Sequence, residues 1–335
     1  MSTRPRNEQT TLFELKEPEI EGAVVRSEHR ELAARLPENV RFGTMSWSFS
    51  GWRGLVYGLD VAVKSLSGAE ALAAYAKNPL LSAVEIDRSY YEPLSAEVYQ
   101  RYAARVPESF RFLVKAHEDC TVPKFPLHAR YGKKRGADNP RYFDASYATD
   151  VVVRPVVEGL GDKLGALLFQ CPPQEVDSPS AFARRLHAFL KRLPSGVPYA
   201  VELRNRELFT AEYAAVLAET GAIHCHNAWS NMPSVLTQAR LIPPVARRPL
   251  VVRWLLPYGQ EYEAARARFA PFDRIVEEDV ASRECIATLA AKAAQHGVTT
   301  LVLVNNKAEG CAPESIFRLA RDIAVRCDVS GARSA

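Results

Sequence analysis

Short apolar runs alternate with helix-like segments along the chain from Val40 onward. Eight of these runs have the length and composition of buried strands. They are Val40–Trp47, Ser82–Ser89, Phe110–Ala116, Gly165–Gln170, Tyr199–Arg204, Ala222–Asn227, Leu250–Trp254 and Thr300–Asn305. Strands separated by helices form parallel βαβ units, and eight such units are typical of a closed (β/α)₈ barrel. We therefore predict an α/β fold, a single TIM-like barrel preceded by an N-terminal arm.

Apolar spacing and capping residues predict helices between the strands. The apolar residues of the segment 182–193 recur on one helical face, and Ser178 precedes that segment as an N-cap. Ser67 and Glu70 have the spacing of a capping box. Gly221 stands between a helical segment and a strand, where glycine supplies a left-handed C-terminal cap. These signals support the βαβ interpretation.

The pattern divides the chain into three parts. We interpret residues 1–39, which are polar and charged, as a flexible N-terminal arm with a short helix near residues 28–36. Residues 40–327 form the barrel domain, and residues 328–335 are expected to be a disordered tail. One unit is irregular, because residues 228–248 show no clear helical pattern.

The composition is that of a globular protein. Of 335 residues, 47% are apolar and 24% charged, which excludes a disordered chain, a coiled coil and a collagen. The net charge of +4 is too small to indicate nucleic-acid binding by itself. The six cysteines form no C-x-x-C pair and are typical of reduced thiols. The sequence shows no secretory leader and no membrane span, so we expect a cytoplasmic protein.

Polar side chains occupy the C-terminal ends of most predicted strands, where TIM barrels have their active sites. Side chains alternate along a strand, so Glu202 and Arg204 share one face. A charge facing the helices would be buried without water, and we therefore place these charges inside the barrel mouth. The set comprises Glu85, Lys115, Gln170, Glu202, Arg204, Arg253 and Asn305. In an alternative interpretation, the charges only neutralise one another.

These residue types predict an enzyme that acts on a small anionic substrate. Lys115, Arg204 and Arg253 are suited to bind a carboxylate or a phosphate. Glu85 and Glu202 would form a catalytic pair across the mouth, with Glu202 as the base and Glu85 as the acid. Hydrolysis, isomerisation and elimination are all compatible with such a pair.

Further candidates surround this set. Trp47 is a candidate substrate-binding aromatic residue, although apolar packing explains it equally well. No cofactor is predicted. A divalent metal is an alternative, with Glu85, Asp87, Glu202 and His226 as its ligands, but no tight metal motif supports it. His226 and its neighbour His224 are more typical of core histidines. The basic segment Cys120–Tyr142 follows the strand of Lys115, and we predict that it is a lid over the mouth.

Six segments resemble the YecE-like family, also called domain of unknown function 72. They are Gly43–Trp52, Val84–Tyr91, Phe110–Ala116, Lys163–Pro173, Ala200–Arg204 and Asn305–Pro313. The resemblance covers about residues 42–325. It implies a TIM-like barrel without an established reaction, and it places the family's pocket on the same inward polar residues.

A second functional hypothesis rests on the N-terminal arm. Gln9, Leu12 and Phe13 fit the pattern Q-x-x-L-F, which resembles the short peptide with which bacterial proteins bind the DNA sliding clamp. The alternative to the enzyme is thus an accessory or binding module in nucleic-acid maintenance.

Overall fold

The computed structural model describes residues 22–334 except 24, 177, 246 and 247, and its eight parallel strands form a closed barrel. The strands are β1 (Val40–Thr44), β2 (Ala83–Ile86), β3 (Arg111–Lys115), β4 (Leu164–Cys171), β5 (Tyr199–Leu203), β6 (Ile223–Ala228), β7 (Leu250–Trp254) and β8 (Thr300–Val304). β8 pairs with β1 and closes the barrel. The predicted (β/α)₈ fold is confirmed, and each strand overlaps the run predicted for it.

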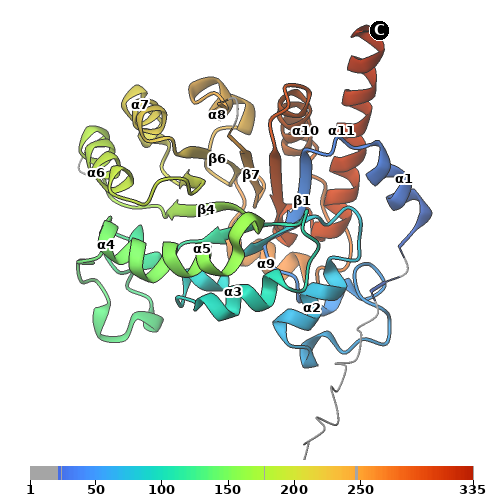
Figure 1. Ribbon diagram of the computed structural model, residues 1–335, viewed down its shortest axis with the longest axis horizontal. Helices are drawn as coiled ribbons and strands as arrows, with labels where there is room; N and C mark the ends of the chain where they lie inside the picture. Colours follow the sequence, from blue (N-terminus) through green and yellow to red (C-terminus); the bar gives the residue numbers. More distant parts are fainter. Residues whose placement is uncertain (1–21, 24, 177, 246–247, 335) are drawn as a thin grey trace, which may run out of the picture.

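Helices surround this barrel (Figure 1). They are α1 (Ser27–Arg35), α2 (Gly68–Tyr75), α3 (Ala96–Ala103), α4 (Ala145–Tyr147), α5 (Arg154–Leu160), α6 (Pro179–Lys191), α7 (Ala211–Thr220), α8 (Val235–Leu241), α9 (Tyr262–Phe269), α10 (Val280–Gln295) and α11 (Ala312–Ser334). The predicted caps are present. Ser67 and Glu70 form a capping box, Ser178 accepts a hydrogen bond from the N–H of Ala181 at 3.0 Å, and Gly221 is left-handed with φ 84°.

The structure corrects three predictions at the edges of the barrel. Residues 228–248, predicted to lack a helix, contain the short helix α8. α1 packs along α11, with the rings of His29 and Phe317 4.5 Å apart, so this part of the arm belongs to the folded domain (Figure 1). α11 continues to Ser334, through most of the expected tail. The clamp-like peptide, Gln9 to Phe13, lies outside the described residues.

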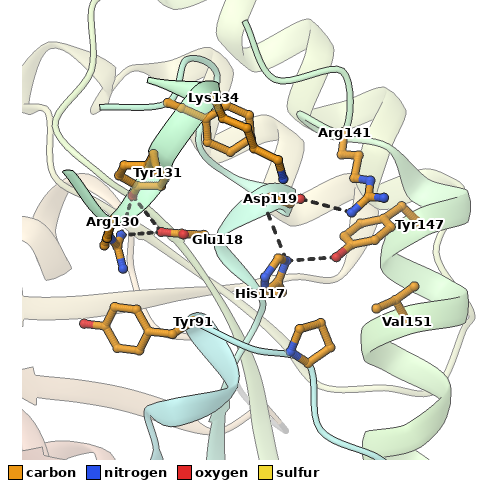
Figure 2. A pocket seen from close by; sticks show the side chains of 12 residues that line it. Tyr91, His117, Glu118, Asp119, Arg130, Tyr131, Lys134, Arg141, Tyr147 and Val151 are labelled. Carbon is orange, nitrogen blue, oxygen red and sulfur yellow. Dashed lines mark hydrogen bonds and ion pairs between the residues drawn. The ribbon is translucent and has the colours of Figure 1, made fainter. Parts of the chain in front are cut away.

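The long segment after β3 is folded rather than extended (Figure 2). The side-chain amide of Asn139 donates to the carbonyls of Asp119 and Val122 at 2.8 and 2.7 Å, which ties the end of the segment to its beginning. Backbone hydrogen bonds join Phe125 to Gly136 and Ala137. The segment therefore has a defined shape beside the end of β3.

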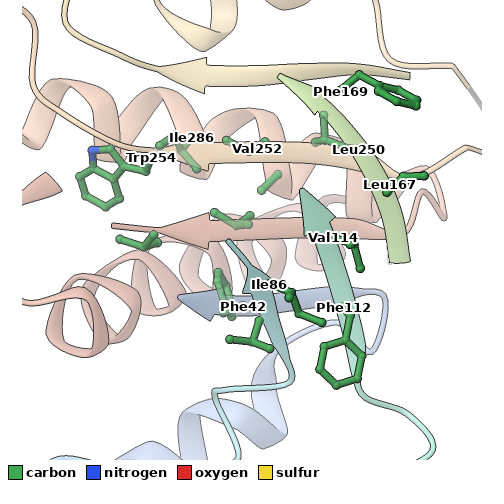
Figure 3. Packing of buried hydrophobic residues seen from close by; sticks show 14 of the residues in the cluster. Phe42, Ile86, Phe112, Val114, Leu167, Phe169, Leu250, Val252, Trp254 and Ile286 are labelled. Carbon is green, nitrogen blue, oxygen red and sulfur yellow. The ribbon is translucent and has the colours of Figure 1, made fainter. Parts of the chain in front are cut away.

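Two apolar clusters stabilise the barrel, one on each side of its wall. The larger cluster lies between the strands and the helices, and Figure 3 shows several of its members, among them Phe112, Leu167 and Val252. The second cluster fills the barrel interior with Ala83, Leu113, Ala166, Leu168, Ala200, Cys225, Val251, Leu301 and Leu303. Because side chains alternate along a strand, the residue two positions after the last of these on each strand also points inward. That next layer is the polar one.

Two expectations from composition can be compared with the structure. All six cysteines have free thiols. None of the helices in the described part of the chain is both long and apolar enough to cross a membrane.

Candidate functional site

A cavity of about 450 Å³ opens at the carboxyl ends of the strands. Six of the predicted site residues line it: Glu85, Lys115, Gln170, Arg204, Arg253 and Asn305. They come from β2, β3, β4, β7 and from the positions that follow β5 and β8. The inward orientation deduced from strand alternation thus brings these side chains together. Two other predicted residues, Glu202 and Trp47, are not part of the lining.

Arg253 connects the two carboxylates of the predicted pair. Its Nε and Nη2 donate to the two oxygens of Glu85 at 2.9 and 2.7 Å, while its Nη1 donates to Glu202 and, at 3.1 Å, to Gln170. Burial alone would lower the pKa of Arg253, but Glu202 and Glu85 outweigh burial and raise it. Arg253 is thus a fixed cation that stabilises both carboxylates, and its donors are committed to them.

Glu202 lies behind the cavity wall with both carboxylate oxygens occupied. One oxygen accepts from Arg204 and from Asn227 at 3.2 Å, and the other accepts from Arg253. Burial raises the pKa of this carboxyl, but Arg204 and Arg253 outweigh that effect and hold the pKa below its ordinary value. Glu202 is therefore held ionised, chiefly by the two arginines.

This environment is incompatible with the predicted role of Glu202 as a base that contacts the substrate. Its side chain is completely buried and already accepts three charged or amide donors. Arg204, which shares the inward face of the strand with Glu202, forms a direct ion pair with it. Glu202 is positioned to fix Arg204 and Arg253 rather than to reach a ligand.

Glu85, in contrast, lines the cavity and has a pKa above its ordinary value. Burial raises the pKa, Arg253 offsets part of this effect, and the nearby Asp87 raises it again. A carboxyl group with a raised pKa can carry a proton closer to neutral pH and release it to a bound molecule. Of the predicted pair, Glu85 is the member that lines the cavity and has a raised pKa, although its side chain is as fully buried as that of Glu202 and both of its oxygens accept from Arg253.

Three other cations line the cavity, and each rests on an aromatic ring. Lys115 lies 4.0 Å from the ring centroid of Tyr90, and its ammonium pairs with Asp87 at 2.9 Å. The guanidinium of Arg204 stacks 4.0 Å from the ring of Trp229. The ammonium of Lys307 lies 4.2 Å from the ring of Tyr262 and 3.5 Å from the amide oxygen of Asn305.

These contacts leave N–H donors available. Arg204 uses Nε and Nη2 for Glu202 and Gln170, and its Nη1 makes no hydrogen bond within the described residues. The ammonium groups of Lys115 and Lys307 have three N–H donors each, and each makes a single hydrogen bond within the described residues. The cations are therefore held in place while some of their donors remain unused in the part of the chain that the structure describes.

The predicted aromatic residue lies elsewhere. The indole of Trp47 donates to the carbonyl of Gly68 at 2.6 Å and packs edge-on against Tyr102, outside the cavity lining. Trp52, from the same segment, lines the cavity instead and donates to Asn306 at 3.2 Å. The alternative interpretation of Trp47, as a packing residue rather than a substrate-binding one, describes its surroundings.

The two histidines of β6 belong to the outer face of the barrel. His224 contacts the hydroxyl of Tyr213 at 3.0 Å and Gln238 at 3.2 Å, and burial lowers its pKa to about 4. His226 packs against His224, whereas the adjacent Asn227 points inward and bonds Glu202. His226 and Glu202 thus lie on opposite sides of the wall, which contradicts their joint role as metal ligands. Within the described residues, no group of three or more His, Cys, Asp or Glu side chains is arranged to hold a metal ion.

Sequence reasoning missed Lys307, Asn227 and Trp229. Trp229 directly follows β6 and Lys307 is the third residue after β8, so their signal is position alone: polar or aromatic residues just beyond a strand end lie at the mouth of a barrel. Asn227 is an inward residue of β6 whose partner could not be deduced from alternation.

The fold agrees with the comparison with known proteins. Residues 41–333 match the family described as "Protein of unknown function DUF72". The chain belongs to the DUF72 family. No curated protein has a similar sequence.

Solved structures of DUF72 proteins share the fold. A DUF72 family protein from Thermotoga maritima is 17% identical, with a TM-score of 0.54, over 84% of this chain and 98% of that chain. A DUF72 family protein from Enterococcus faecalis is 15% identical, with a TM-score of 0.53, over 86% of this chain and 95% of that chain. At this identity the likeness concerns the barrel and not its chemistry.

Proposed function

We propose that the barrel mouth of this DUF72 protein binds a small organic anion, a carboxylate or a phosphate, and that Glu85 exchanges a proton with it. The observation that carries the proposal is the set of three cations, Lys115, Arg204 and Lys307, that line one cavity with unused donors. Charge-assisted hydrogen bonds from such groups favour an anionic ligand over a neutral one. The reaction classes that fit are hydrolysis, isomerisation and elimination.

The carboxylates of the mouth divide their roles in this proposal. Glu85 is the proton donor or acceptor, because it lines the cavity, unlike Glu202, and burial raises its pKa. Glu202 is a positioning residue that holds the guanidinium of Arg204 toward the cavity. Such a supporting ion pair keeps the anion-binding group in one orientation before the ligand arrives.

Calorimetric titration of the whole protein with inorganic phosphate and, separately, with acetate tests anion binding. Lys307→Gln is the most informative variant, because no carboxylate in the described part of the chain depends on Lys307. We expect it to weaken binding by at least about tenfold, the value of one hydrogen bond to a charged group. Lys292→Gln on the exposed face of α10 is the matched control and should bind like the wild type.

The acid–base role has its own test. A screen of phosphate esters and hydroxy acids supplies a substrate, and Glu85→Gln should then retain anion binding while losing turnover. Unchanged affinity in both Lys307→Gln and Arg204→Met would refute the anion site. Full turnover by Glu85→Gln would refute the proton transfer alone.

A further inference from the structure

A second cavity, of about 580 Å³, lies beside the barrel mouth in the folded segment that follows β3 (Figure 2). Its charged lining consists of His117, Glu118, Asp119, Arg130, Lys134 and Arg141. The volume lies within the range of small-molecule sites. The proposed function does not use this cavity.

Each of its three permanent cations is supported by aromatic rings, as the cations of the mouth are. The guanidinium of Arg130 lies 4.9 Å from the ring of Tyr91 and 4.5 Å from that of Tyr131. Lys134 lies 5.2 Å from the ring of Phe125. Arg141 lies 4.4 Å from the ring of Tyr147. The aromatic faces fix the cations without neutralising their charge.

Two buried carboxylates orient the arginines further. Glu118 accepts hydrogen bonds from Nη2 of Arg130 at 2.5 Å and from the hydroxyl of Tyr131 at 2.9 Å. Asp119 accepts from Nη1 of Arg141 at 3.1 Å. Each arginine therefore pairs with its carboxylate through one nitrogen, and its Nε and second Nη bind no carboxylate within the described residues.

Lys134 gives the cavity its excess positive charge. Within the described residues it pairs with no carboxylate, whereas each of the two arginines does. Burial lowers the pKa of His117 and outweighs Asp119 and Glu118, which raise it, so this ring adds a neutral partner. Its Nδ1 lies 2.9 Å from the hydroxyl of Tyr147.

We propose that this cavity is a second anion subsite, which binds a phosphate or carboxylate group through Lys134, Arg130 and Arg141. Its three cations converge on one space and outnumber the two carboxylates that hold them. Planar guanidinium groups match the oxygens of both anions, so the shared chemistry is that of an oxyanion.

The subsite adjoins the barrel mouth. Tyr91 lines both cavities. The segment at the end of β3 also contributes to both cavities, because Lys115 lines the mouth and residues 117–119 line the second cavity. A ligand with an anionic group at each end could therefore occupy both cavities across Tyr91. This step rests on the proposed function of the mouth, whereas the subsite itself does not.

Titration with inorganic phosphate tests the subsite separately from the mouth. We expect two phosphates per chain, one weakened at least about tenfold by Lys134→Gln and the other by Lys307→Gln. Lys134→Gln leaves no carboxylate without its partner, so the variant should fold normally, and circular dichroism checks this. Lys133→Gln removes the same charge from the adjacent, exposed residue outside the lining and should change neither affinity.

The outcomes separate the two proposals. Loss of a phosphate in Lys134→Gln but in no mouth variant supports the subsite while refuting the mouth. A single phosphate that depends only on Lys307, or Lys134→Gln behaving like Lys133→Gln, overturns the subsite. The same titration with acetate shows whether the subsite takes carboxylates as well.

A second titration tests the two-ended ligand. A series of straight-chain α,ω-dicarboxylates and α,ω-bisphosphonates should show an affinity maximum at one length, because a linker must match the span between two sites. Lys134→Gln and Lys307→Gln should each abolish that maximum. Affinity that does not vary with length would overturn simultaneous occupation of both cavities.

Discussion

Arg253 and Glu85 form a two-pronged ion pair across the inside of the barrel. Arg253 stands on β7 and Glu85 on β2, two strands that are not neighbours in the sheet. Their nitrogen–oxygen distances are 2.9 and 2.7 Å, and both side chains are almost completely buried. Through its third nitrogen, Arg253 also holds Glu202 on β5. One guanidinium therefore braces three strands beneath the candidate site.

This brace predicts a large loss of stability in Arg253→Met. The variant leaves Glu85 and Glu202 without their shared cation, and an unpaired buried charge costs about 3–5 kcal/mol. Urea unfolding at neutral pH measures the loss. Arg154→Met is the control, because its pair with Asp150 is about 60% exposed on both sides and such pairs contribute about 0–1 kcal/mol. Similar losses in the two variants would show that the brace is not needed for the fold.

Glu202→Gln should also destabilise the protein by about 3–5 kcal/mol, because two arginines lose their carboxylate. The folded-state pKa of Glu202 is lowered, so its stabilising contribution is full above the ordinary value of 4.5. That contribution disappears as the pH falls through the folded-state pKa. The stability difference between wild type and Glu202→Gln should therefore shrink as the pH falls below 4.5. A difference that is constant over this range would contradict the assignment.

Glu85→Gln should show the opposite pH dependence. Because the folded-state pKa of Glu85 is raised, its contribution is full below the ordinary value of 4.5 and is lost as the pH rises through the folded-state pKa. Relative to wild type, Glu85→Gln should become less destabilising as the pH increases from 4.5. Unfolding curves collected for both variants over the same pH series show whether the two slopes have opposite signs.

The sequence was sufficient for the barrel because each strand is buried on both faces. Inside and outside positions alternate, so the run Val201 to Arg204 already divides into apolar outward and charged inward residues. The same alternation placed Glu85, Lys115 and Arg253 at the mouth. Local patterns of this kind survive in the folded protein because they follow from backbone geometry.

Such local patterns could not predict which side chains pair with each other across the barrel. Which cation meets Glu202 depends on the register and tilt of strands that are far apart in the sequence, and Arg253 from β7 meets it whereas Lys115 from β3 pairs with Asp87. Trp47 and Trp52 are both tryptophans of one motif, and only the path of the loop decides which of them reaches the cavity. The second cavity depends on tertiary contacts that close one long segment.

Gly43 in β1 predicts a steric effect on the sheet. A Cβ atom at this position would lie 2.2 Å from the carbonyl oxygen of Ala83 on β2, which forces the two backbones apart. Gly43→Ala should therefore destabilise the protein by about 1–3 kcal/mol or more, the usual cost of overpacking. Gly68→Ala at the start of α2 is the control. Its nearest contact is the Tyr102 hydroxyl at 3.4 Å, and a helical alanine should instead stabilise slightly. Thermal melts compare the two.

Trypsin cleavage tests whether the segment after β3 acts as the predicted lid. Lys133, Lys134 and Arg135 are exposed and give trypsin a site within it. If an anion in the second cavity draws Arg130, Lys134 and Arg141 together, the segment opens less often, and proteolysis follows the population of the open form. Inorganic phosphate should then slow cleavage at residues 133–135 in the wild type but not in Arg141→Gln. Cleavage after Arg274, whose side chain is 72% exposed, serves as the internal reference for trypsin activity. If phosphate slows both sites equally, or neither, the segment is a fixed insertion rather than a lid.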